Sequence, residues 1–157
     1  MFIASRRLFA TFLLLVAFAP IAGADDTPKT TVTSPSMKRL LLGRHHLSLQ
    51  WVSWDRFGSV VVTDQAGTLT IKGEQKSRDG VDFVRIDGVV TRVDAKEFGF
   101  RGTIVTQVSH INGGNPCVRD GEFTFAIKAN RQYWRLQQMD NPCEPVTDYV
   151  DVYFRRG

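Results

Sequence analysis

The two cysteines, Cys117 and Cys143, are the most reactive side chains of the chain, and each ends an Asn-Pro-Cys triplet. A redox pair is typically spaced Cys-x-x-Cys, and these two are far apart in the sequence. A zinc site needs more ligands, and the neighbours His45 and His46 would point to opposite faces of a strand. The sequence therefore predicts a disulfide between Cys117 and Cys143 and no metal site.

No arrangement of residues indicates an enzyme. None of the serines lies in a Gly-x-Ser-x-Gly turn, and no Gly-rich phosphate loop precedes a helix. Asp148 and Asp151 are close in the sequence, but on a strand their carboxylates point to opposite faces, which argues against a catalytic dyad. We therefore predict no catalytic residue and no cofactor, and an enzyme is kept as a third alternative that a buried cluster of carboxylate, His and Ser in one cleft would support.

A band of glycines marks the first candidate site, because Gly73, Gly88 and Gly102 each end an apolar-x-apolar-x-Gly pattern. Inward glycines in neighbouring strands indicate a sheet that coils strongly and closes on itself. Such a barrel can hold a small apolar or amphiphilic ligand against aromatic rings, although Trp51 and Trp134 are alternatively plain core residues. The candidate ligand-binding residues are Trp51, Trp54, Gly73, Gly88, Gly102 and Trp134.

An aromatic and charged strand face marks the second candidate site. Tyr149, Asp151 and Tyr153 alternate along the last predicted strand, and Tyr133 and Arg135 lie on the strand before it. Tyrosine and arginine are enriched among the residues that dominate the affinity of protein interfaces. These five residues are therefore candidates for contact with a protein, and the alternative is an ordinary solvated strand face.

The elements that position these residues are strands, because the chain alternates apolar and polar residues from about residue 40 onward and shows no convincing helical period. We predict about eight strands, over 47–53, 57–64, 67–76, 82–93, 97–109, 121–128, 131–139 and 147–155. Asp87-Gly88 could alternatively form a type I′ turn that splits the fourth strand. The same pattern at Gly73 and Gly102, without a preceding Asp, favours a long strand.

A hairpin explains the position of the cysteines. Its predicted turn is Ala129-Asn130 or a slightly longer loop, and with the two-residue turn Phe125 faces Trp134 and Phe123 faces Leu136. One face is then apolar on both strands, which a slip of one residue would destroy. The cysteines lie at the open base of this hairpin, where their Cα atoms can come within the roughly 7 Å that a disulfide spans.

Residues 1–24 have the pattern of a secretory signal peptide, with two arginines, an apolar run and small residues that end at Ala24. We expect cleavage after Ala24 and a periplasmic or secreted bacterial protein, exported by the Sec or the twin-arginine route. Residues 25–38 are predicted to be a flexible leader before a single domain over 39–157. Without the two arginines the net charge is +2, and no second apolar run could span a membrane, so we expect neither a nucleic-acid partner nor a membrane span in the mature chain.

The predicted fold is all-β, an up-and-down barrel or alternatively a β-sandwich. The strands, the signal peptide and the disulfide near the C-terminus resemble the calycin barrels of the lipocalins, and Thr147-Asp148-Tyr149 is similar to a short lipocalin motif. The lipocalin Gly-x-Trp is absent, since Gly43 precedes Trp51 by eight residues, so the resemblance implies the barrel shape and no ligand residue. We therefore predict a non-enzymatic exported barrel that binds a small apolar or amphiphilic ligand. The alternative is a protein-binding module of the cell envelope, such as an inhibitor or an assembly factor.

Overall fold

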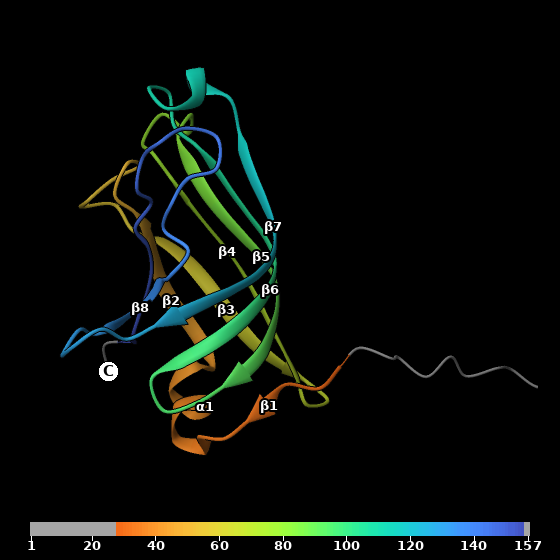
Figure 1. The fold of residues 1–157 in the computed structure, drawn as a ribbon. Helices are drawn as coiled ribbons and strands as arrows, with labels where there is room; N and C mark the ends of the chain where they lie inside the picture. The colour runs from red at the N-terminus through yellow and green to blue at the C-terminus, as the bar shows by residue number, and fades with distance from the viewer. Residues whose placement is uncertain (1–27, 156–157) are drawn as a thin grey trace, which may run out of the picture.

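The computed structural model describes residues 28–155, which form a barrel of eight strands with one extra strand, one α-helix and one 3-10 turn (Figure 1). The strands are β1 (Thr31–Val32), β2 (Gly43–Leu49), β3 (Gly58–Gln65), β4 (Thr68–Lys76), β5 (Phe83–Val93), β6 (Glu97–Gln107), β7 (Cys117–Ala126), β8 (Tyr133–Leu136) and β9 (Val150–Tyr153). The helix α1 spans Pro35–Leu41, and the 3-10 turn η1 spans Asn112–Gly114. Each predicted strand occurs at least in part. β2 is displaced toward the N-terminus from the predicted range 47–53, and β7 begins before the predicted range 121–128. β8 and β9 are shorter than the ranges 131–139 and 147–155 predicted for them.

The barrel closes because each strand from β2 to β8 pairs antiparallel with the next, and β9 pairs with β2. In the closing ladder, Leu47 lies opposite Val152 and Leu49 lies opposite Val150. The predicted up-and-down barrel is therefore confirmed. The alternative of a β-sandwich is excluded, because a sandwich is two separate sheets with free edges.

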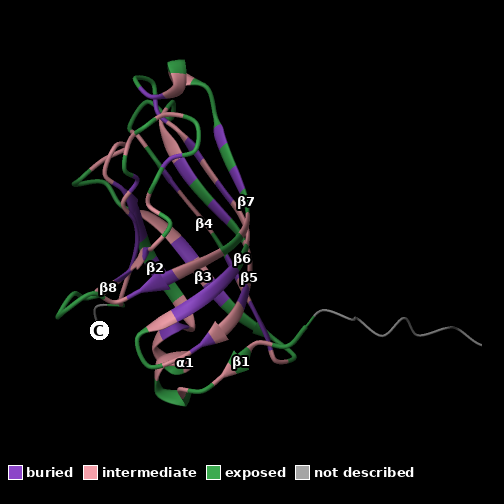
Figure 2. Ribbon diagram, viewed as in Figure 1, coloured by how far each residue is buried: buried purple, intermediate pink, exposed green. Residues whose placement is uncertain are grey.

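Buried positions recur along the strands (Figure 2), and the apolar side chains at these positions fill the interior of the barrel. The largest fully buried side chains are Trp134, Phe98, Phe100, Phe125, Leu41, Leu47, Leu49, Leu69, Ile71, Ile86, Ile104 and Leu136. Phe98 stacks on Phe125 with 5.0 Å between ring centroids, and Trp134 meets Phe98 edge-on at 5.8 Å. Removal of this apolar surface from water is the main force that stabilises the barrel.

Three glycines, Gly88, Gly102 and Gly121, lie side by side on β5, β6 and β7. β5 runs through Gly88 without a break, so the predicted long strand is confirmed and the alternative of a turn there is wrong. A Cβ atom on Gly88 would lie 2.3 Å from a backbone oxygen of β6 and 2.7 Å from the Phe100 ring. These glycines thus permit the close approach of strands in a coiled sheet, and Phe100 already occupies the space beside Gly88.

Two short elements lie within or overlap the range predicted as a flexible leader: the strand β1 at Thr31–Val32 and the helix α1, which begins at Pro35. Thr31 and Val32 pair in parallel with the end of β5 at Arg92 and Val93, beyond the last pair that β5 makes with β4. Sequence reasoning could not find this strand, because its two residues make no pattern of their own. It exists because β5 extends past its neighbour and offers a free edge.

The helix α1 covers one end of the barrel (Figure 1), where Leu41 is fully buried. Ser34 caps the helix by accepting a hydrogen bond from the Met37 backbone N–H at 3.3 Å, and Pro35 stands at the first helical position. Seven residues are too few to show a helical period, so alternation alone did not predict this helix.

The predicted signal peptide, residues 1–24, lies outside the residues that the structure describes. The first residues of the predicted leader, 25–27, lie outside them as well. Between residues 28 and 155, no helix has the length and the apolar character needed to cross a lipid bilayer.

The hairpin of β7 and β8 differs in register from the prediction. Phe125 pairs with Leu136 and Ala126 pairs with Arg135, so the predicted pair of Phe125 with Trp134 is wrong by two positions. The turn is longer than Ala129-Asn130, which is the alternative left open above. Because the shift is even, every side chain keeps its predicted face, and Phe125, Trp134 and Leu136 are all buried as expected.

Gly102 and Gly121 form a matched pair for testing the glycine contacts, because their φ angles are 155° and 153°. A Cβ on Gly102 would lie 2.3 Å from the Asp87 carbonyl oxygen, whereas a Cβ on Gly121 would meet nothing within 4 Å. We predict that Gly102→Ala lowers the free energy of unfolding by about 1–3 kcal/mol more than Gly121→Ala does. This difference is the typical cost of overpacking. Urea denaturation of the two variants measures the difference, and equal losses would contradict the prediction.

Candidate functional site

The six predicted ligand-binding residues do not line one common site, although Gly88 lies opposite Gly102 and both Trp51 and Trp54 line a hollow on the surface. Trp134 is part of the core, Trp54 is 72% exposed, and Trp51 is half-buried with its ring edge-on to His110 at 6.1 Å. The space beside Gly73 is filled as well, since a Cβ there would lie 2.4 Å from the Cα of Val60. The geometry therefore gives no support for an interior cavity shared by these residues.

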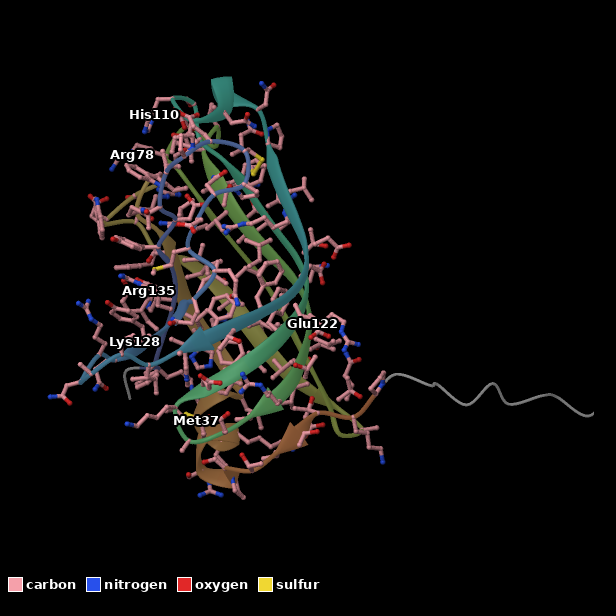
Figure 3. All side chains as sticks on the ribbon, in the orientation of Figure 1. Met37, Arg78, His110, Glu122, Lys128 and Arg135 are labelled. Carbon is pink, nitrogen blue, oxygen red and sulfur yellow. A yellow bond between two sulfur atoms is a disulfide. The ribbon has the colours of Figure 1, made fainter. Side chains whose placement is uncertain are left out.

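The five predicted protein-contact residues do come together, on the outer face of β8 and β9. Tyr133 lies opposite Tyr153 and Arg135 lies opposite Asp151 in the ladder of these two strands. The rings of Tyr133 and Tyr153 are 5.2 Å apart. Arg135 lies on the same side of the barrel as Lys128 at the tip of the hairpin (Figure 3).

Arg135 holds this cluster in one arrangement. Its Nε and Nη2 atoms each donate to a carboxylate oxygen of Asp151 at 2.7 Å. The guanidinium lies 4.1 Å from the ring centroid of Tyr149 and 5.1 Å from that of Tyr133. The hydrogen bonds that Arg135 donates to the Asp151 carboxylate raise the pKa of Arg135 above its ordinary value. A bidentate ion pair between stacked rings has little freedom to move, so these rings form a preorganised surface.

The cluster continues along the outer wall through residues that the sequence analysis did not select. Phe57 meets Tyr153 edge-on at 5.1 Å and His46 at 5.5 Å. We call the set Tyr149, Arg135, Tyr133, Tyr153, Phe57 and His46 the aromatic row. Alternation along β2 places His46 outside, and it confirms that His45, which is buried, points to the opposite face. Phe57 lies just before β3, where no periodicity indicates a direction.

The loop that carries Phe57 is anchored to the barrel by Gln75, a buried residue of β4. The Gln75 Nε2 atom donates to the carbonyl oxygens of Ser53 at 3.2 Å and Arg56 at 2.8 Å, and its Oε1 accepts from the Leu49 N–H at 2.7 Å. A buried amide with three partners fixes the loop between β2 and β3. Trp54 and Phe57 are consequently held outward, with Phe57 42% exposed.

His45 connects the helix α1 to β9 beneath the aromatic row. Its Nε2 lies 2.7 Å from the Leu41 carbonyl oxygen, and its Nδ1 lies 2.9 Å from the Tyr153 carbonyl oxygen. Burial lowers the pKa of His45, and the two carbonyl contacts offset part of that effect. The His45 side chain is therefore a buried structural link beneath the aromatic row and has almost no contact with solvent.

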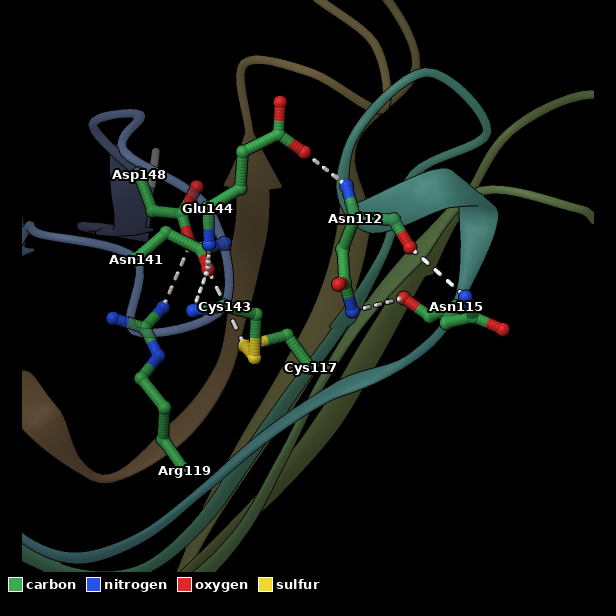
Figure 4. Close-up of a disulfide and its surroundings, with 8 residues drawn as sticks. All are labelled: Asn112, Asn115, Cys117, Arg119, Asn141, Cys143, Glu144 and Asp148. Atoms are coloured by element: carbon green, nitrogen blue, oxygen red, sulfur yellow. Dashed lines mark hydrogen bonds and ion pairs between the residues drawn. A yellow bond between two sulfur atoms is a disulfide. The ribbon is translucent and has the colours of Figure 1, made fainter.

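The disulfide Cys117–Cys143 closes the barrel where the ladder is shortest (Figure 4). β7 pairs with β8 at only two positions, and the Cα atoms of the cysteines are 5.9 Å apart farther along β7. The predicted disulfide is thus confirmed. Asn141 secures the same loop, because its Oδ1 accepts from the backbone N–H groups of Cys143 at 2.8 Å and Glu144 at 3.3 Å.

A buried ion pair lies beside the disulfide (Figure 4). Arg119 Nη2 and Asp148 Oδ2 are 3.0 Å apart, and Asn141 Nδ2 donates to the same oxygen at 3.1 Å. Burial raises the pKa of Asp148 and lowers the pKa of Arg119, and the attraction between the two charges opposes both shifts. Asp148 and Asp151 belong to different ion pairs, with Arg119 and Arg135 respectively.

We predict that the double variant Cys117→Ala/Cys143→Ala keeps the barrel but unfolds more easily. Loss of the cross-link between residues 26 apart removes about 3 kcal/mol of stabilisation and lowers the melting temperature by roughly 10 °C. Circular dichroism melting of the oxidised, reduced and double-variant proteins measures this. Loss of all structure on reduction, or an unchanged melting temperature, would contradict the prediction.

The ion pair is tested separately. We predict that Arg119→Met destabilises the protein by about 3–5 kcal/mol, because it leaves the buried Asp148 carboxylate without its partner. The double variant Arg119→Met/Asp148→Asn recovers more than half of that loss, since neither side chain then carries a charge. Chemical denaturation of the two variants gives the comparison, and a double variant less stable than Arg119→Met alone would refute it.

The chain matches known proteins over most of its length. The sequence profile of the PM1083 family matches residues 29–154. A protein of Pasteurella multocida (strain Pm70), named "Uncharacterized protein PM1083", is 46% identical over 114 residues, which cover 73% of this chain and 73% of the relative. No solved structure matches the chain.

Proposed function

The chain belongs to the PM1083 family, and we propose that it is an exported, non-enzymatic barrel that binds another protein of the cell envelope. The proposed contact surface is the aromatic row on the outer face of β8, β9 and β2. This was the alternative interpretation of the sequence, and the geometry supports it better than a ligand inside the barrel.

The observation that carries the proposal is the position of the exposed apolar side chains. Trp54, Phe57, Val81 and Val118 are the large apolar residues exposed within residues 28–155. Two of these four border the aromatic row: Phe57 belongs to it, and Trp54 lines a hollow of 470 Å³ together with Tyr149. Aromatic residues and arginine held rigidly beside exposed apolar groups have the composition of interface hot spots.

The interior and the carboxylates support a binding role on the outside. The barrel core is filled by side chains that are fully buried, so a ligand or partner has to contact the outer wall. The carboxylates of Asp148 and Asp151 are each paired with an arginine, which leaves neither free for proton transfer. A disulfide fits a protein of the periplasm or of the extracellular space, where thiols are oxidised.

The proposal is tested by recovery of a partner on immobilised full-length mature protein from an envelope extract of the bacterium that makes it. We predict that the amount of stoichiometric partner recovered on the variant Trp54→Ser/Phe57→Ser is at least about tenfold lower than on the unaltered protein. The reason is that each hot-spot residue typically contributes about 2 kcal/mol or more to binding. The matched control is Val81→Ser/Val118→Ser, which removes two exposed apolar side chains elsewhere on the barrel.

The control variant is expected to retain the partner fully. Recovery of no stoichiometric partner, or equal losses in the two variants, would refute binding through the aromatic row. Melting curves of both variants check that each barrel is folded, and because the replaced side chains are exposed we expect little change in stability.

A further inference from the structure

Two hollows on the outer wall meet at the Phe57 end of the aromatic row. Their volumes are 690 Å³ and 530 Å³, within the range of about 300–1,000 Å³ that small-molecule sites occupy. His46, Phe57 and Arg155 line both hollows, so the two form one continuous groove. We call it the Phe57 groove.

The larger hollow is cationic. Arg44, Arg56 and Arg155 line it, and within residues 28–155 none of the three has an acidic partner. Its one lining carboxylate, Glu74, is already shared by Lys76 at 2.7 Å and by a neighbouring arginine at 3.1 Å. Three guanidinium groups without a counter-charge favour an anion that can accept several hydrogen bonds.

Two of these arginines are held in place by neutral groups. Arg44 Nη1 donates to the Ser59 hydroxyl at 3.1 Å, and Arg155 Nη2 donates to the Arg39 carbonyl oxygen at 3.3 Å. Gly43 makes room for Arg155, because a Cβ there would lie 3.0 Å from its Nη1 atom. Each guanidinium keeps further N–H donors for a bound anion.

The smaller hollow is mainly apolar, with Gln132 and the shared Arg155 and His46 among its lining residues. Phe57, Tyr153 and Phe154 line it, and the Phe154 ring lies 4.3 Å from that of Trp134 in the core. The floor of this hollow is therefore continuous with the packed interior. An apolar chain laid here loses contact with water without disturbing a hydrogen-bonded group of the ladder.

We propose that the Phe57 groove binds a single-chain amphiphile with an anionic head, either a phosphate or a carboxylate. The head lies among Arg44, Arg56 and Arg155, and the chain lies over Phe57 and Tyr153. This site is on the outer wall, in contrast to the interior site expected from the sequence. Phe57 and Tyr153 belong to both proposed surfaces, but the arginines that hold the head lie outside the aromatic row, so variants of these arginines test this proposal separately from the protein-binding role.

The test is a nuclear magnetic resonance titration of the full-length mature protein with decyl phosphate and with decanoate, each below its micelle concentration. We expect the amide signals of residues 44–46, 57–59 and 153–155 to shift, and both anions to bind at least about tenfold more tightly than decyl maltoside or decyltrimethylammonium. A preference for decyl phosphate points to a lipid phosphate as the natural head, and a preference for decanoate points to a fatty acid.

The variant Arg44→Gln/Arg155→Gln is expected to bind either anion at least about tenfold more weakly. Lys72→Gln/Arg101→Gln is the matched control, because it removes the same charge from exposed positions of β4 and β6 and should bind as the unaltered protein does. Three outcomes would overturn the proposal. The protein could bind decyl maltoside as tightly as the anions, the Arg44→Gln/Arg155→Gln variant could bind the anions as tightly as the unaltered protein, or hexaglutamate could bind more tightly than either anion. The Arg44→Gln/Arg155→Gln variant also distinguishes this proposal from the protein-binding role. Because it leaves the aromatic row intact, it should still retain the protein partner while it loses affinity for the anions.

Discussion

The barrel depends on the seam beside β7, where the ladder is too short to hold the wall together by itself. β7 and β8 share two pairs of residues, fewer than any other neighbouring strands of the barrel. Farther along β7, the chain between β8 and β9 covers the seam through the disulfide Cys117–Cys143 and the ion pair of Arg119 with Asp148. Covalent and electrostatic contacts thus replace backbone hydrogen bonds there, which is why a domain large enough to form its own core also has a cross-link.

Closure of the wall has a direct consequence for binding. Side chains that alternate inward meet at the axis, and rings such as Phe98, Phe100 and Phe125 fill the volume that a wider barrel leaves for a ligand. The inward glycines also leave no space for a ligand, because they let neighbouring strands approach each other closely where the sheet coils. Binding is therefore directed to the outer wall, where β9 brings the end of the chain against β2.

The two proposed regions share Phe57 and Tyr153, which lie between the stacked Arg135 and the arginines of the groove. On one side the guanidinium is neutralised by Asp151 and serves as a rigid support for rings. On the other side Arg44 and Arg155 have hydroxyl or carbonyl neighbours and keep their charge available. The same residue type thus stabilises a surface in one place and provides an anion site in the other, according to whether a carboxylate lies opposite.

The sequence by itself determined the strands, the inward and outward faces and the disulfide. Period-two alternation specifies the face of a side chain even when the register is wrong, as the β7–β8 hairpin shows with its shift of two positions. Only the tertiary structure decided that Tyr153 lies against Phe57, that Arg155 joins Arg44, and that Thr31 and Val32 pair with the free end of β5. The physical reason is that alternation describes one strand at a time, whereas the neighbours of a strand are chosen when the whole ladder closes and residues distant in the sequence come to share one wall.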